Sequence, residues 1–220
     1  MLLPRVVDKS RIFLLSPASS SGKRASLLFN PDADFTLAQR VRSESGAPLG
    51  EVFSFLSGLY FRGKLTYARA FENPPSEAIP GIHIITPSDG LCSPELMVTL
   101  DDLEAFAEVP IDVDEFRYRV PLERDATALA NGISPTCEVV LLGSVATGKY
   151  VDVLLPILRD SLVFPEEFLG HGDMARGGML LKRAATGVEL TYISASDPSR
   201  LASRTRRTGP NADERVGGSG

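Results

Sequence analysis

The chain has 220 residues, of which 43% are hydrophobic, so it is long and apolar enough to form one large domain with a substantial core. Its formal net charge of −5 argues against a protein that coats nucleic acid, because domains that follow phosphate backbones are usually basic. The cysteines (Cys92, Cys137) and histidines (His83, His171) lack zinc-ligand spacing, and so few cysteines fit a reducing, cytoplasmic compartment. No apolar stretch approaches the roughly 18 residues of a membrane span, and none has the form of a signal peptide.

Short apolar runs alternate with helical periodicities along the chain, which is typical of an α/β fold. The predicted strands are residues 12–15, 81–86, 137–142 and 162–164, with a short strand or extended linker at 96–100. One predicted helix starts at Ala25. The others cover residues 33–41, 49–71, 101–107, 121–130 and 146–158. Gly58 and Gly63 mark either a break or close packing within the long segment, and Thr99 is a suitable N-cap.

The C-terminal region reads differently from the rest. Residues 178–182 and 188–193 bracket Ala185-Thr186-Gly187 and predict a terminal hairpin. Residues 194–220 have almost no apolar side chains, so we expect a disordered tail after a single domain over 1–193. The predicted fold is a three-layer, Rossmann-like α/β domain with a mostly parallel central sheet, in which the strands beginning near 11, 81 and 137 are adjacent or nearly so.

The loop after the first strand carries the clearest candidate site. Its sequence, SPASSSGK over residues 16–23, gathers hydroxyls, a glycine and an ammonium group between a strand and a helix. Open α/β sheets bind ligands at the carboxyl ends of their strands. We therefore predict an anion cradle made by Ser16, Ser19, Ser20, Ser21, Gly22 and Lys23, against the alternative of a solvated serine-rich connection.

This loop differs from a phosphate-binding P-loop at two positions. Pro17 stands where the first glycine belongs, and Arg24 replaces the Ser or Thr whose hydroxyl would bind magnesium. Magnesium-dependent ATP hydrolysis of that kind is therefore not expected.

Two further strand ends carry similar chemistry. The second strand ends in TPSDGL over residues 86–91. We predict that Ser88 and Asp89 bind the ligand there, or that Asp89 acts as a base. The alternative is that Asp89 only forms an Asx-turn before Gly90. The third strand ends in GSVATGKY over residues 143–150. There Gly143 permits close approach of a ligand, Ser144 and Thr147 offer hydroxyls, and Lys149 offers a positive charge. The alternative is that Lys149 points into water.

Two other segments hold residues capable of chemistry. The glycine-rich stretch 170–178 contains His171, Asp173 and Arg176, which are candidates for proton transfer and anion binding, or it only connects two elements. Arg62, Lys64 and Arg69 lie among tyrosines in the segment 49–71, either to stack on a base or, as we prefer, as parts of an ordinary amphipathic helix.

The pattern of the first 160 residues resembles a poorly characterised α/β superfamily that includes the central domain of archaeosine synthase and bacterial relatives linked to deazaguanine modification. In that family a strand ends in a Pro-Cys-Ser or Ser-Cys loop followed by lysine, as in residues 16–23, although Ala18 and Ser19 replace the cysteine here. The family's helix with Leu-Tyr-x-Gly and Ala-Arg character is similar to residues 59–71, and its Ser-x-x-Gly-Leu strand end is similar to residues 86–91. The resemblance implies modified-nucleobase or nucleotide chemistry.

Two functions of different classes remain open at this point. The first is an enzyme acting on a nucleobase-, nucleotide- or other anion-containing ligand, with Asp89, His171 and Asp173 as candidate catalytic groups. The second is a non-catalytic protein that senses such a ligand or docks a partner. RNA or DNA is a possible substrate, but the composition predicts no broad basic surface. The sequence points to no metal, particular cofactor or oligomeric state.

Overall fold

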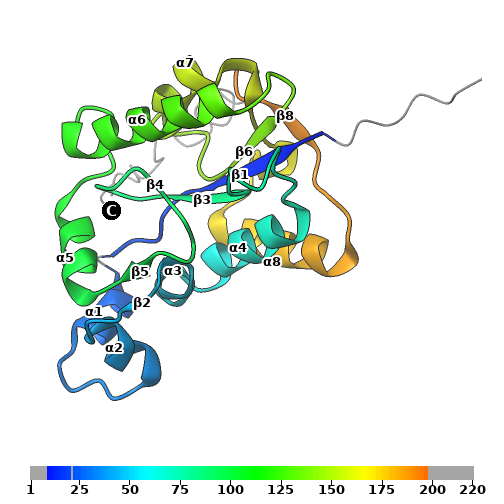
Figure 1. The fold of residues 1–220 in the computed structure, drawn as a ribbon. Helices are drawn as coiled ribbons and strands as arrows, with labels where there is room; N and C mark the ends of the chain where they lie inside the picture. The colour runs from blue at the N-terminus through cyan, green and yellow to red at the C-terminus, as the bar shows by residue number, and fades with distance from the viewer. Residues whose placement is uncertain (1–8, 21, 198–220) are drawn as a thin grey trace, which may run out of the picture.

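A computed structural model describes residues 9–20 and 22–197 of the chain. Its centre is a sheet of strands in the order β4-β3-β1-β6-β7-β8 (Figure 1). The bounds are β1 Arg11–Leu15, β3 Ile82–Ile85, β4 Leu91–Cys92, β6 Glu138–Leu142, β7 Leu162–Pro165 and β8 Tyr192–Ser194. The four inner strands are parallel, and the edge strands β4 and β8 are antiparallel to their neighbours. The predicted mostly parallel α/β sheet is confirmed.

β1 lies inside the sheet because every side chain after its first residue is apolar. Ile12 and Leu14 enter the core on one face, while Phe13 and Leu15 enter the core on the other. β3 pairs with β1 on one side and β6 on the other, both in parallel register. The predicted adjacency of these three strands is therefore confirmed, and their carboxyl ends share one edge of the sheet.

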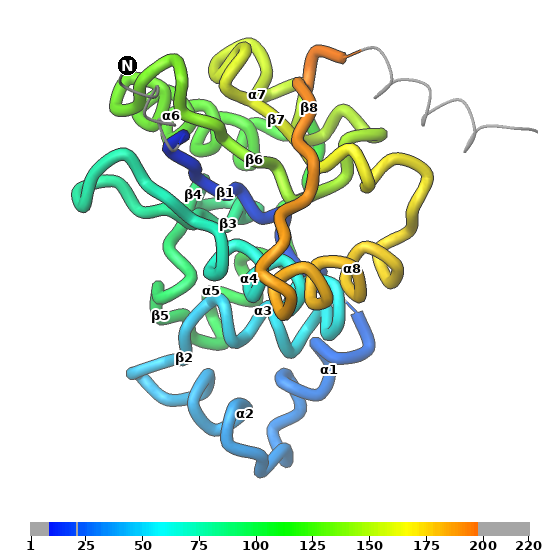
Figure 2. Tube along the Cα trace, turned by 90° about the vertical axis from the view of Figure 1, so that its right-hand side faces the viewer, coloured from blue at the N-terminus to red at the C-terminus, as the bar shows by residue number. Residues whose placement is uncertain are grey.

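Helices cover both faces of the sheet, giving the predicted three layers (Figures 1 and 2). One face carries α6 Phe116–Gly132 and α7 Val151–Leu158, and the other carries α3 Leu49–Ser57, α4 Leu59–Phe71 and α8 Asp173–Thr186. The smaller elements are α1 Lys23–Phe29, α2 Thr36–Val41, α5 Leu100–Glu108, the 3₁₀ turns η1 Arg159–Ser161 and η2 Glu166–Phe168, and a ribbon of β2 Ala47–Pro48 with β5 Met97–Val98.

Both predicted roles of glycine in the segment 49–71 occur. Gly58 has a φ of 61° and separates α3 from α4, which are two helices and not one. Gly63 lies in the interior of α4, where a Cβ would come within 2.7 Å of the carbonyl oxygen of Gly177. The absence of a side chain there lets α4 and α8 cross closely.

The predicted hairpin of residues 178–182 and 188–193 does not form. Residues 173–186 are helix α8, which ends at Gly187 in the left-handed conformation, and β8 pairs with β7 instead. Gly177 lies inside this helix because the crossing needs it: a Cβ there would lie 2.9 Å from the carbonyl oxygen of Leu59. A glycine that indicated a loop by composition is a helix-packing residue.

Some predicted boundaries also move. α7 begins at Val151, later than the expected 146, and α6 begins at Phe116 and continues through Pro121. The expected helix after Thr99 is confirmed as α5, where the Thr99 N–H donates to Asp102 Oδ2 at 2.7 Å. The ordered chain continues past 193: β8 ends at Ser194 and the next residue, 195, is buried. The remainder of the predicted tail, 198–220, lies outside the described residues.

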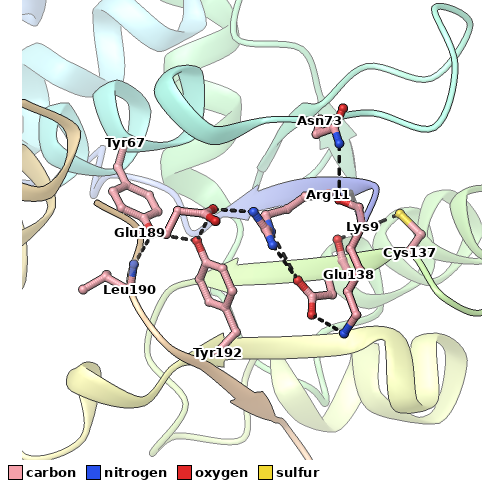
Figure 3. Close-up of polar contacts among 9 residues, drawn as sticks. All are labelled: Lys9, Arg11, Tyr67, Asn73, Cys137, Glu138, Glu189, Leu190 and Tyr192. Carbon is pink, nitrogen blue, oxygen red and sulfur yellow. Dashed lines mark hydrogen bonds and ion pairs between the residues drawn. The ribbon is translucent and has the colours of Figure 1, made fainter. Parts of the chain in front are cut away.

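A polar cluster lies at the amino end of β1, opposite the edge where the parallel strands end (Figure 3). Arg11 Nη2 lies 2.9 Å from Glu138 Oε2 of β6, and Arg11 Nη1 also pairs with Glu189, which precedes β8. The Tyr192 hydroxyl donates to Glu189 at 3.2 Å and lies 2.6 Å from the hydroxyl of Tyr67 on α4. The cluster therefore connects β1, β6, α4 and the last strand.

Candidate ligand-binding site

A cavity of about 710 Å³ opens at the edge where the parallel strands end. The chain order explains its position. β1 is flanked by β3 on one side and β6 on the other, and the segments that follow β1 and β6 lead to helices on opposite faces. Such a switch point leaves a crevice between the two departing segments, and α/β proteins usually bind ligands there.

Three strand ends and parts of several helices line the cavity. Residues 16–20 and 22–24 follow β1, Pro87 follows β3, and Ser144, Lys149 and Tyr150 follow β6. The rest of the lining comes from Leu56 and Ser57 of α3, Tyr60 of α4, residues 106, 107 and 109–111, and Asp173 of α8. The strand ends supply most of the hydroxyl groups and positive charges, whereas residues 56, 106, 107 and 109–111 are apolar.

The structure brings together much of the predicted site. The predicted residues that line the cavity are Ser16, Ser19, Ser20, Gly22, Lys23, Ser144, Lys149 and Asp173. Ser16 and Ser20 are buried, while Lys23 is exposed at the mouth. Ser21 lies outside the described residues. The helix that follows, α1, has seven residues and no side-chain hydrogen bond at its amino end.

Ser88 and Asp89, the predicted ligand-binding pair after β3, form hydrogen bonds within their own turn. The Ser88 hydroxyl donates to Asp89 Oδ1 at 2.8 Å, and the Asp89 N–H donates to Thr86 Oγ1 at 2.9 Å. Thr86 therefore closes this turn, and neither Ser88 nor Asp89 is among the cavity-lining residues. Only Pro87 of the turn reaches the cavity.

The other predicted residues, His171, Arg176, Thr147 and Gly143, do not line the cavity. His171 is exposed, with Nδ1 3.2 Å from the carbonyl oxygen of Leu169. Arg176 is buried and donates through Nη2 to the Phe168 carbonyl at 2.7 Å, which holds the start of α8 against η2. Thr147 is exposed. Gly143 has a supporting role: a Cβ on it would lie 3.0 Å from the Cβ of Ser16, so it makes room for that serine.

Lys64, which the sequence analysis grouped with Arg62 and Arg69 and assigned by preference to an ordinary amphipathic helix, is buried beside the cavity-lining residue Ser16. Its side chain is 1% exposed, and its amine donates to the carbonyl oxygen of Ser16 and to Ser16 Oγ, the latter at 2.8 Å. The ring centroids of Tyr60 and Phe61 lie 4.7 and 4.8 Å from Nζ. No ion pair joins Lys64 to a carboxylate within residues 9–20 and 22–197. The helical spacing of buried Tyr60, Phe61 and Tyr67 was the available signal, because it places Lys64 on the same face.

Burial governs the ionisation of this lysine. Desolvation lowers the pKa of Lys64 to about 7, and the opposing charge of Asp173 on α8 only partly offsets that effect. Burial likewise raises the pKa of Tyr60 to about 12 and raises the pKa of Tyr150. The tyrosine hydroxyls of the cavity lining are therefore uncharged at neutral pH, and the Lys64 amine behind Ser16 loses its proton far more readily than a free lysine does.

Two buried hydroxyls of the cavity lining lack a hydrogen-bond partner in the described part of the chain. They are Ser20 Oγ and the Tyr60 hydroxyl, on side chains that are 7% and 8% exposed. Native proteins satisfy nearly all buried polar atoms with protein or bound groups, because an unsatisfied one costs about 1–3 kcal/mol. The Arg176 guanidinium interacts with the Tyr60 side chain but makes no hydrogen bond of normal geometry with its hydroxyl, so both hydroxyls are available to a bound polar molecule.

The fold and the cavity define a Rossmann-like α/β protein with a polar site at the carboxyl edge of its sheet. Comparisons with family models, with curated proteins and with solved structures found no match to this chain. Within the described residues, no cluster of three or more His, Cys, Asp or Glu side chains is placed to hold a metal ion. No helix in the same residues is long and apolar enough to cross a membrane.

Proposed function

We propose that the protein binds a small anionic ligand of the nucleobase, nucleoside or nucleotide type in this cavity, and that it acts in the cytoplasm on modified nucleobases. The observation that carries the proposal is the pair of unpartnered buried hydroxyls, Ser20 Oγ and Tyr60 OH, in a cavity that also holds Lys23 and Lys149. Unpartnered hydroxyls favour a polar ligand, and two lysines favour a negative charge on it.

The cavity has the size and the mixed lining that such a ligand needs. Its volume of about 710 Å³ falls within the range of small-molecule sites, roughly 300–1,000 Å³. Apolar Leu56, Phe106 and Ile111 are available to contact a base or another flat ring, and the strand ends supply hydroxyls and charges. The resemblance to the archaeosine synthase superfamily supports a nucleobase in particular.

The first experiment is a thermal-shift screen against nucleobases, nucleosides, nucleotides and sugar phosphates, followed by calorimetry. Lys23→Ala should weaken binding of the selected ligand by about 1.5–3 kcal/mol, roughly 10- to 100-fold in Kd, as expected for loss of a charged hydrogen bond. Lys23→Met keeps most of the aliphatic stem, so it should lose nearly as much affinity. Lys182→Met removes an exposed lysine away from the cavity and is the matched control.

The alternatives give different results. If Lys23→Ala and Lys23→Met bind like the parent, Lys23 is a solvated lysine and the anion cradle is wrong. Tighter binding of an RNA or DNA oligonucleotide than of its free base or nucleotide would assign a nucleic-acid substrate. A non-catalytic sensor is the second candidate function, because a cavity of this kind is sufficient for binding; such a protein would bind the ligand without ever converting it.

A further inference from the structure

We infer that Ser16 and Lys64 form a nucleophile and general-base pair that transfers an acyl group from an anionic ester or amide to Ser16 Oγ. The inference rests on the proposed function in one respect, namely that the cavity binds an anionic small molecule. It adds a reaction, a bond and two catalytic residues to that binding site.

The two reacting atoms are already in contact. Lys64 Nζ lies 2.8 Å from Ser16 Oγ, within the hydrogen-bond range required of a base and its nucleophile. Ser16 lines the cavity at the end of β1, while Lys64 approaches it from α4 on the protein side. A ligand in the cavity therefore meets the hydroxyl, and the amine lies behind it.

Backbone contacts hold both groups in place. The Ser16 N–H donates to the carbonyl oxygen of Leu142 at 3.1 Å, and the Ser16 hydroxyl donates to the same oxygen at 3.3 Å. The Lys64 amine is the donor to Ser16 Oγ in this arrangement, so the hydroxyl proton must rotate toward a neutral Lys64 before it can be transferred. The Lys64 amine also donates to the Ser16 carbonyl, so the lysine side chain is fixed to the residue it would activate. Gly143 leaves the space that the Ser16 side chain occupies. Serine and lysine form such pairs on several unrelated folds.

The surroundings keep the amine able to accept a proton. The ionisable groups that face the pair are Asp173 of α8, which acts on Lys64, Tyr60, whose ring lies 4.7 Å from Lys64 Nζ, and Tyr150, which interacts with Ser16. Arg176 of α8 acts on Tyr60. Asp173 raises the pKa of Lys64, but burial outweighs it and leaves the pKa at about 7. A base that titrates near the working pH is the most effective kind.

The reaction balances with water as its only co-reactant. Ser16 Oγ forms a bond to the carbonyl carbon while its proton passes to the neutral Lys64 amine. The ammonium then gives that proton to the departing alcohol or amine, which leaves an ester on Ser16. Lys64 next takes a proton from water as the water oxygen attacks the same carbon, and returns it to Ser16 Oγ as the acid departs. The charged part of the substrate remains against Lys23 or Lys149 throughout.

A fluorophosphonate probe tests the pair without knowledge of the substrate, because Ser16 Oγ would displace fluoride from phosphorus while Lys64 accepts the proton. Mass spectrometry should find the adduct on Ser16, and Ser16→Ala should not be labelled at that site. Lys64→Met should label at least ~100-fold more slowly, as should Lys64→Arg, whose guanidinium stays protonated. Lys182→Met should label at the parent rate. The parent rate should rise with pH, with a midpoint near 7.

Two results would overturn the inference: a folded parent protein that gives no Ser16 adduct, or a Lys64→Met variant that labels at the parent rate. If circular dichroism shows that Lys64→Met does not fold, the pH profile of the parent decides, and a flat profile between about pH 6 and pH 9 overturns the pair. Calorimetry on the parent separates the two proposals. Ligand binding without Ser16 labelling rejects only the reaction, whereas labelling without ligand binding rejects only the nucleobase ligand.

Discussion

Gly63 of α4 and Gly177 of α8 lie against each other where the two helices cross, and neither position has room for a side chain. A Cβ on Gly63 would lie 2.7 Å from the carbonyl oxygen of Gly177, and a Cβ on Gly177 would lie 2.9 Å from Cα of Tyr60. Real Cβ atoms essentially never approach so closely, so any larger residue must push the helices apart.

The neighbouring Gly178 provides a matched comparison within the same helix. Gly177→Ala should lower the free energy of unfolding by about 1–3 kcal/mol because of the clash with backbone atoms of α4. Gly178 is exposed and an added Cβ meets nothing within 4 Å, so Gly178→Ala should raise stability by up to ~1 kcal/mol through helix propensity. Urea denaturation measures both, and equal effects would contradict the close crossing.

Lys64 should give the protein a characteristic dependence of stability on pH. Its pKa is about 7 in the folded chain and 10.5 as a free side chain, so between these values the unfolded chain binds a proton that the folded chain does not. Stability therefore rises with pH in this window, by up to ~1.4 kcal/mol per pH unit, and is independent of this group below pH 7.

The measurement compares the parent with Lys64→Met, which keeps the volume of the side chain but cannot titrate. Urea denaturation at several values between about pH 7 and pH 9 gives the difference in unfolding free energy. The unfolding free energy of the parent, relative to that of Lys64→Met, should increase as the pH rises. A constant difference would show that Lys64 is charged in the folded protein throughout this range.

Tyr60→Phe should leave the stability of the ligand-free protein nearly unchanged, within about 0.5 kcal/mol, because the hydroxyl that it removes makes no hydrogen bond of normal geometry in the described residues and has only the Arg176 guanidinium nearby. Tyr118→Phe is the comparison, since the Tyr118 hydroxyl donates to the Lys149 carbonyl at 2.8 Å, and its loss should cost about 0.5–1.5 kcal/mol. Tyr60→Phe should still weaken ligand binding in calorimetry. A large loss of stability from Tyr60→Phe would reveal a partner for that hydroxyl within the protein.

The polar cluster at the start of β1 predicts unequal effects of two similar substitutions. The Tyr67 hydroxyl accepts the buried N–H of Leu190 at 2.8 Å, so Tyr67→Phe leaves that donor unsatisfied and should cost about 1–3 kcal/mol. Tyr192→Phe loses only the contacts with Tyr67 and Glu189 and should cost about 0.5–1.5 kcal/mol. Chemical denaturation of the two variants ranks them, and the reverse order would reject this assignment of roles.

The sequence predicted the inner strands and several helix ends, because short apolar runs, an N-cap residue and a glycine each act on their immediate neighbours. The apolar runs within 11–15, 82–85 and 138–142 have too few polar groups to face water, so they form the inner strands. Thr99 starts α5, and Gly58 interrupts the helical stretch, because each acts on its own neighbours. The loop after β1 lines the cavity together with residues after β3 and β6, because the carboxyl ends of parallel strands share an edge.

What sequence reasoning missed depends on contacts between distant segments. Gly177 indicates a loop until α4 is known to press against it, and Asp89 looks available until Ser88 and Thr86 engage it. Lys64 looks like one more surface charge until β1 brings Ser16 to its amine. In each case the role of the residue depends on a contact with a residue distant in sequence or on the path of a turn. Composition and periodicity carry no information on either.

β1 is fastened at both ends, by ion pairs at Arg11 and by the lysine amine at Ser16. These contacts oppose sliding of β1 against its neighbours, and they differ in what they protect. Substitution of Arg11 would remove the ion pairs that join β1 to β6 and to the segment before β8, and so lower the stability of the fold. Substitution of Ser16, the residue after the five-residue strand, would instead change the lining of the cavity.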